Sequence, residues 1–156
     1  MSPANLKTKP MSASCVEMTE MVLPQDTNSQ GNIFGGRVMQ LIDIAASVAA
    51  LRHSRKPVNT VFIDQLDFKH PIKMGHIVIL HAQVEYVGKT SMEIGVEVFS
   101  ENPLTGEQIK TTNAHLVFVA LNEKGSPTKV AQVLPETEDE KRRFQEAKQR
   151  RESRRK

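Results

Sequence analysis

The sequence predicts an α+β domain in which one curved antiparallel sheet wraps around a single long helix. One observation is the segment from Val38 to Leu51, where eleven of fourteen residues are apolar, as expected of a central helix. A helix that is apolar on most sides should be covered on most sides. One such sheet leaves a sheet edge and part of the helix uncovered, so at least a dimer is expected. The other observation is a series of four β-type segments between residues 60 and 121 that are joined by short turns. Short turns favour an antiparallel meander over a parallel β-α-β arrangement.

Length and composition narrow the class of protein. A chain of 156 residues most simply forms one domain, and a single cysteine, Cys15, excludes an internal disulfide framework and fits a reducing compartment. No apolar run reaches the roughly 20 residues that span a bilayer, and the first fifteen residues do not resemble a signal peptide. We therefore expect a cytoplasmic protein without a membrane partner.

The formal net charge of +3 resides in the tail. From Glu136 onward there are nine Lys or Arg and six Asp or Glu residues, and the remaining chain is balanced. A neutral body with seven Phe or Tyr residues and no Trp is poorly suited to stacking nucleic-acid bases, so no nucleic-acid partner is expected. A basic arm that binds nucleic acid remains a third, weaker alternative for the tail.

The elements before the helix are expected to be short. Residues 1–13 are polar, contain Pro3 and Pro10, and should form a flexible N-terminal arm. The segment 14–23 alternates well enough for a strand that Pro24 ends, and 25–32 is a loop of small polar residues. Gly35 and Gly36 follow just before the helix, where a missing Cβ allows close approach of backbone or ligand.

The elements after the helix complete the sheet. Alternating and β-branched residues predict four strands, and the folded domain is expected to span 14–134. A tail helix should occupy 135–156, because Thr137 and Glu140 have the spacing of a capping box. With only Phe144 and Ala147 as apolar anchors, this helix should dock loosely and fray after about Arg150. The four predicted strands are 60–69, 76–87, 91–100 and 107–121.

Three polar residues of the central helix, Gln40, Asp43 and Ser47, share one stripe. The stripe is compatible with an ordinary solvent face or with a functional acid. Surface helices of this length usually carry Lys and Glu pairs, but this one has neither between Val38 and Leu51. Asp43 is therefore a candidate catalytic carboxylate.

The start of the same helix is suited to polarising a carbonyl group. Unpaired N–H groups at a helix N-terminus stabilise negative charge, and Gly35 and Gly36 let an oxygen approach them. Asp43 lies two turns further along, so that a carbonyl held at the helix start is expected to lie between them. A thiolate, whose thiol has a pKa of ~8.5, leaves without strong acid help. The layout therefore favours thioesters over esters or amides.

Several other kinds of site are absent from the sequence. It contains no Gly-x-Ser-x-Gly elbow, Walker loop, dinucleotide fingerprint or His-Glu-x-x-His motif. The five histidines never pair at metal-ligand spacing, so no metal site is expected.

Two groups of motifs resemble those of the acyl-CoA thioesterases of the hotdog fold, whose sheet wraps a long helix. Among these, the bacterial broad-range and the brain-type cytosolic hydrolases are the most similar group. The similarity runs from about Val16 to Leu121. Its main motif is Asp26-x-Asn28-x-x-Gly31-Asn32-x-Phe34-Gly35-Gly36 followed by Leu41-Ile42-Asp43, and the further segments are Phe68-Lys69-His70-Pro71-Ile72-x-x-Gly75 and Val87-Gly88-Lys89-Thr90-Ser91.

The resemblance implies roles for these residues. Asp43 would be the essential carboxylate, with Asn28 contributed by the opposite subunit of a dimer and the glycine pair near the thioester oxygen. The dimers would assemble into a trimer of dimers. Asn28 alternatively forms only an Asx-turn that shapes its loop. Substrate or coenzyme A contacts are implied for the motif residues Phe68, Lys69, Gly88, Lys89, Thr90 and Ser91.

Several residues are candidates for binding the phosphates of coenzyme A. Family members often have Arg-Ser where this chain has Lys89-Thr90, and a lysine offers a point charge in place of a fork. Lys89 is alternatively a solvated hairpin residue. Arg142 and Arg143, early in the tail helix, are further candidates for a phosphate contact.

The sequence thus favours an enzyme that hydrolyses acyl-CoA to a free carboxylic acid and coenzyme A, without a metal or redox cofactor. A non-catalytic acyl-CoA-binding sensor on the same fold is the main alternative. A hotdog dehydratase is less favoured, because no histidine occupies the loop-and-helix site.

Overall fold

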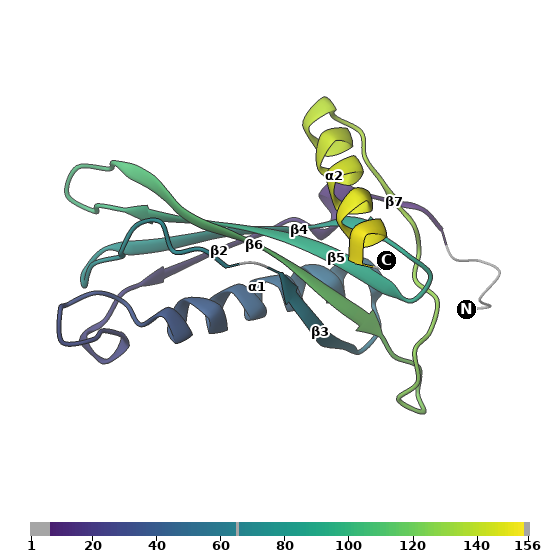
Figure 1. Cartoon of the computed structure of the whole chain (residues 1–156), viewed down its shortest axis with the longest axis horizontal. Helices are drawn as coiled ribbons and strands as arrows, with labels where there is room; N and C mark the ends of the chain where they lie inside the picture. The colour runs from purple at the N-terminus through teal and green to yellow at the C-terminus, as the bar shows by residue number, and fades with distance from the viewer. Residues whose placement is uncertain (1–6, 65, 155–156) are drawn as a thin grey trace.

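A computed structural model describes residues 7–64 and 66–154 of the chain. Its centre is a five-stranded antiparallel sheet with the order β2-β4-β5-β6-β3. Helix α1 (Gly35–Ser54) lies against one face of the sheet and helix α2 (Glu138–Arg154) against the other (Figure 1). The α+β hotdog arrangement that the sequence predicted is confirmed.

The strands follow the predicted segments with one change in pairing. Strands β4 (Ile77–Val87), β5 (Ser91–Glu101) and β6 (Gln108–Ala120) form an antiparallel meander, and β2 (Val16–Met21) pairs with β4 at one edge. Strand β3 (Val58–Asp64) ends earlier than expected and pairs with β6 at the opposite edge. The expected four-strand meander is therefore wrong at β3. The end of β3 and the start of β4 are too far apart in sequence for a tight hairpin. The chain instead crosses from β3 at one edge of the sheet to β4, which lies next to β2 at the other edge.

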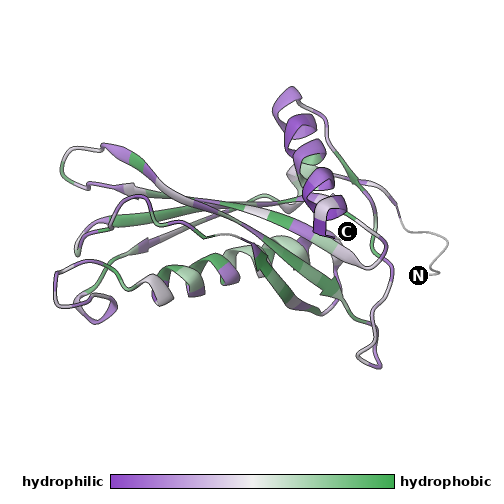
Figure 2. Cartoon of the chain, viewed as in Figure 1, coloured by the Kyte–Doolittle hydropathy of each residue, from purple (hydrophilic) through white to green (hydrophobic). Residues whose placement is uncertain are grey.

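The main hydrophobic core lies between α1 and the sheet (Figure 2). Alternate residues of β5 point at the helix, because side chains on a strand alternate between its faces. Alanines of α1 allow the helix to approach the sheet closely. The fully buried residues from the three central strands include Val78, Leu80, Val84, Met92, Ile94, Val98, Leu116 and Phe118, and those of α1 include Val38, Ile42, Ala45, Ala46, Ala49 and Ala50.

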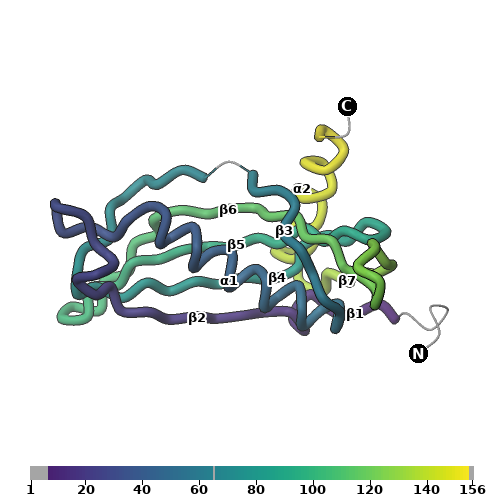
Figure 3. Tube along the Cα trace, turned by 90° about the horizontal axis from the view of Figure 1, so that it is seen from below, coloured from purple at the N-terminus to yellow at the C-terminus, as the bar shows by residue number. Residues whose placement is uncertain are grey.

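The side of α1 that faces away from the sheet is open in the single chain. Met39, Ile44 and Leu51 are each 41–43% exposed. Seen from this side, the helix lies over the middle of the sheet (Figure 3). One sheet covers only one side of a helix, so part of α1 is left uncovered in one protomer, as expected from the sequence.

The N-terminal segment belongs to the folded body from Lys9 onward. Strand β1 (Lys9–Pro10) pairs in parallel with β7 (Val133–Leu134), and the following 3-10 turn (Met11–Ser14) buries Met11 completely. The expected flexible arm is thus wrong for residues 9–13, because the apolar Met11 side chain packs into the core. Residues 1–6 lie outside the described residues.

The tail helix begins as predicted and is more firmly attached than expected. Thr137 Oγ1 accepts from the N–H of Glu140, and Glu140 Oε1 accepts from the N–H of Thr137, so the capping box is confirmed. The helix continues to Arg154 without fraying at Arg150. Besides Phe144, which packs on the Tyr86 ring, arginine side chains hold it to the sheet. No helix in the described residues combines the length and apolarity needed to cross a bilayer.

Candidate active site

The first turn of α1 provides unpaired N–H groups. Phe34 is the N-cap, and its carbonyl accepts from the N–H groups of Arg37 and Val38. In the described part of the chain, the N–H groups of Gly35 and Gly36 have no acceptor. The glycines lie inside the helix as its first two residues, and not just before it as the sequence predicted, because Phe34 adopts the extended N-cap conformation.

The space around the two glycines differs. The Phe68 ring lies 3.5 Å from the point where a Cβ on residue 35 would be, so it contacts this turn. Nothing lies within 4 Å of the corresponding point at Gly36. A carbonyl oxygen can therefore reach the Gly36 side of the helix start, and Phe68 lies beside it. The next residue, Lys69, lies beside β6, where its N–H donates to the carbonyl of Thr111.

The loop before the helix is shaped by Asn28. Its side-chain oxygen accepts from the N–H groups of Gln30 at 2.9 Å and Asn32 at 3.2 Å, which is the Asx-type turn weighed from the sequence. These bonds use the oxygen of the half-buried side chain. Among the described residues the Nδ2 group has no acceptor, so it remains free to donate to a ligand.

Asp43 is half-buried on the open side of α1 and is held by a neighbouring strand. The Thr60 hydroxyl on β3 donates to Asp43 Oδ1 at 2.8 Å. The sequence pattern did not indicate Thr60, because only the pairing of β3 with β6 brings that strand beside the helix. The hydroxyl fixes one carboxylate oxygen and leaves the other available.

The distance along α1 separates Asp43 from the N–H groups. Gly36 and Asp43 are seven residues apart, which is about 10 Å along a helix. An attacking atom must lie roughly 3–3.5 Å from the carbonyl carbon. The expectation that one carbonyl lies between both groups of a single helix is therefore not met within one protomer.

The turn between β4 and β5 contains the other motif residues. Lys89 is exposed, and the carbonyls of Lys89 and Thr90 accept from the N–H groups of Val130 and Ala120. The Ser91 hydroxyl accepts from Arg151 Nη1 of α2 at 2.6 Å. This turn is thus fixed by backbone bonds and lies beside the end of α2.

Arg142 and Arg143 are engaged by protein carboxylates. Arg142 bonds Asp139 and Glu146 on its own helix. Arg143 bonds Asp139, Glu85 and Glu97. Although burial alone would lower the pKa of Arg143, the hydrogen bond that it donates to Asp139 and the nearby carboxylates raise this pKa above its ordinary value.

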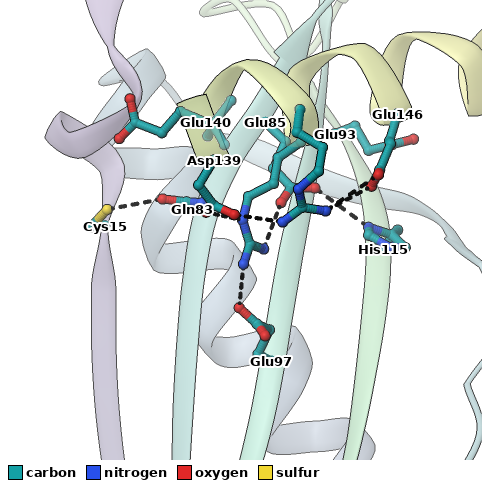
Figure 4. A network of polar contacts seen from close by, with 12 residues as sticks. Cys15, Gln83, Glu85, Glu93, Glu97, His115, Asp139, Glu140 and Glu146 are labelled. Atoms are coloured by element: carbon teal, nitrogen blue, oxygen red, sulfur yellow. Dashed lines mark hydrogen bonds and ion pairs between the residues drawn. The ribbon is translucent and has the colours of Figure 1, made fainter. Parts of the chain in front are cut away.

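The outer face of the sheet carries two buried acids that sequence analysis did not single out. Glu85 and Glu93 are 1% and 3% exposed, and arginines of α2 meet both (Figure 4). The carboxylate of Glu85 lies directly over Gly95, where a Cβ would clash with it. Among the described residues, no three His, Cys, Asp or Glu side chains are arranged to hold a metal ion.

Comparison with known proteins identifies the family to which this fold and site belong. The model of the Thioesterase superfamily matches residues 30–107. The uncharacterized acyl-CoA thioester hydrolase YkhA of Bacillus subtilis is 42% identical over 127 residues, which cover 81% of this chain and 74% of that protein. A solved apo-hexameric acyl-CoA thioesterase is 43% identical with a TM-score of 0.92, and 96% of each chain is covered.

An acyl-CoA hydrolase of Staphylococcus aureus has been solved with butyryl coenzyme A, coenzyme A and coenzyme A disulfide. It is 37% identical with a TM-score of 0.90, covering 95% of this chain and 90% of that one. Structures of its Asp43Ala, Thr60Ala and Asn28Ala mutants also match. This chain belongs to the Thioesterase superfamily and is a thioester hydrolase.

Proposed function

We propose that this protein hydrolyses acyl-CoA to a free carboxylic acid and coenzyme A, with Asp43 as general base or nucleophile. The observation that carries the proposal is the bond from Thr60 to Asp43. It orients a lone carboxylate on the open side of α1, where no other acid or base of the helix competes with it.

The carbonyl oxygen needs donors that Asp43's own helix start is too far away to supply. A two-fold dimer resolves this, because the partner's helix start and Asn28 loop approach Asp43 from across the interface. In this arrangement the N–H groups of Gly35 and Gly36 stabilise the developing oxyanion, and Asn28 Nδ2 donates to the substrate. A water that Asp43 deprotonates, or the Asp43 carboxylate itself, adds to the carbonyl carbon. The C–S bond then breaks and the thiolate leaves without a strong acid; where the carboxylate is the nucleophile, water cleaves the resulting anhydride.

Self-association is supported by the surface around Asp43. The open side of α1 exposes the apolar side chains of Met39, Ile44 and Leu51. Strand β3 is an edge strand whose Val61, Phe62 and Ile63 are 56%, 43% and 37% exposed. An exposed apolar edge strand favours pairing with another chain. We therefore expect a dimer built on α1 and β3, and, from the hexameric relative, three dimers per assembly.

The relatives support the residue roles. The Staphylococcus aureus mutants replace an aspartate, a threonine and an asparagine, and this chain has the same residue types at 43, 60 and 28. The complex of that relative with coenzyme A supports the substrate class. The turn at Gly88–Ser91 is our proposed contact for coenzyme A in this chain. The absence of a metal or redox cofactor and the cytoplasmic location stay predictions.

The first arm of the test measures thiol release from acyl-CoA. Because the reaction needs the carboxylate, Asp43→Ala should reduce turnover by at least roughly 1000-fold while coenzyme A binding and assembly persist. The matched control is Gln40→Ala, one turn away on the same polar stripe, which should retain activity. Wild-type turnover in Asp43→Ala would contradict the proposal. Binding of acyl-CoA without thiol release by the wild-type protein would favour the sensor.

The second arm asks whether the site is shared between protomers. Asn28→Ala and Asp43→Ala, each inactive alone, are unfolded together and refolded as a mixture. A mixed dimer has one site with both residues intact, so random mixing should restore about a quarter of wild-type activity. If both residues act within one chain, every site in the mixture lacks one of them and no activity returns.

A further inference from the structure

The arginines of α2 fall into two groups by their partners. Four of the five arginines in the described part of this helix bond carboxylates: Arg142, Arg143, Arg150 and Arg154. Within residues 7–64 and 66–154, Arg151 has no carboxylate partner. Arg151 is therefore a half-buried cation without an ion-pair partner among these residues.

Arg151 is nevertheless held in a defined position. Its Nη1 donates to Ser91 Oγ at 2.6 Å, and its guanidinium lies 5.8 Å from the centre of the Tyr86 ring, a cation–π distance. It also lies directly over Gly88, where any Cβ would clash with the guanidinium. The glycine at 88 thus allows the arginine to lie against the turn between β4 and β5.

A hollow of about 350 Å³ adjoins this arginine. Glu93 also lines it, but Arg150 and Arg154 bond that carboxylate, so it does not neutralise Arg151. The exposed Lys89 adds a second positive charge in the turn. The hollow is lined by Arg151, Arg154, Ser91 and Glu93 together with the rings of Phe62 and Tyr86.

We infer that Arg151 is a phosphate-binding residue for the nucleotide part of coenzyme A. A guanidinium presents a planar fork of N–H donors that matches two phosphate oxygens, and only one of these donors is used by Ser91. The exposed Lys89 supplies a point charge from the same turn as Ser91. The inference rests on the proposed function, since the turn at 88–91 is where that proposal places coenzyme A.

The test compares two thioesters of the same acyl group, one on coenzyme A and one on N-acetylcysteamine, which has no phosphate. Arg151→Gln should lower kcat/KM for the acyl-CoA about 10- to 100-fold, mainly through KM, because a charge-assisted bond is lost. Turnover of the N-acetylcysteamine thioester should stay within about twofold of wild type. The kcat/KM of Arg151→Lys for the acyl-CoA should lie between the values of wild type and Arg151→Gln. The control is Lys148→Gln, which removes the same charge from an exposed position of α2 and should change neither substrate.

An equal loss on both thioesters would assign Arg151 a merely structural role, and no loss on either would remove it from the site. Calorimetric titration with coenzyme A separates this inference from the proposed function. Weaker coenzyme A binding by Arg151→Gln supports the inference even if the wild-type protein fails to cleave acyl-CoA. Equal affinity of wild type and variant overturns it even if hydrolysis is normal.

Discussion

The two faces of the sheet hold their helices by different physical means. On the inner face, α1 buries aliphatic residues such as Ile42 against β4, β5 and β6. On the outer face, α2 is strongly hydrophilic, and its arginines bond the buried Glu85 and Glu93. Apolar burial is non-directional and tolerates small shifts, whereas a buried ion pair needs defined partners and geometry. The two faces of one sheet can therefore act independently: one face forms an apolar core, and the other positions a charged helix.

The largest effect is expected on the inner face. Ile42→Ala should lower the free energy of unfolding by about 3–4 kcal/mol, because it removes a fully buried side chain and leaves a cavity. Denaturant unfolding at a fixed protein concentration measures this, since assembly also contributes to stability. Leu104→Ala, at a position 93% exposed, is the control and should change stability by less than about 0.5 kcal/mol. Similar losses at both sites would contradict the core described here.

An intermediate effect is expected where the outer face is most crowded. Gly95→Ala should cost about 2 kcal/mol, because the new methyl group must displace the Glu85 carboxylate from its arginines. Glu85→Ala should also destabilise, since it removes a buried carboxylate that bonds both Arg143 and Arg150. The double variant should cost about 1–2 kcal/mol less than the sum of the two, since both changes act on the same contact. Strict additivity in this double-mutant cycle would show that Gly95 is not constrained by Glu85.

The smallest effect is a pH dependence of the outer face. Burial alone would raise the pKa of Glu97, but the hydrogen bond from Lys110 and the charges of Arg143 and Lys110 outweigh it and hold the pKa below its ordinary value of 4.5. A carboxyl group with a lowered pKa stabilises the fold above the unfolded pKa, and this contribution is lost as pH falls through the folded pKa.

Wild-type stability should therefore decline as pH falls below 4.5, and Glu97→Gln should remove part of that decline. The difference should stay below about 1 kcal/mol, because the partners are partly exposed. Thermal unfolding across the acidic range measures it. Glu123→Gln, in the exposed turn after β6, is the control and should follow the wild-type curve of stability against pH. If the curve of Glu97→Gln runs parallel to that of wild type, the interaction of Glu97 with Lys110 and Arg143 does not contribute to the pH dependence.

Much of the inner face could be read from the sequence. The apolar run from Val38 to Leu51 predicted α1, and the alternation from Ser91 onward predicted β5 with the correct side chains inward. Asp43 could be singled out because it is the lone carboxylate on that helix. These inferences succeed because hydrophobic periodicity is a local property, visible within one turn or one strand.

The contacts on the outer face of the sheet and the residues that neighbour Asp43 became visible only in the tertiary structure. Thr60 meets Asp43 only because β3 pairs with β6, and Arg151 meets Ser91 across 60 residues of chain. Met11 joined the core although its neighbours read as a polar arm. The sequence by itself determined the helix, most of the strands and the candidate acid, since each follows from local patterning. Folding decided which strand lies beside that acid and which arginine of α2 has no carboxylate partner among the described residues, because contacts between distant residues leave no periodic signal.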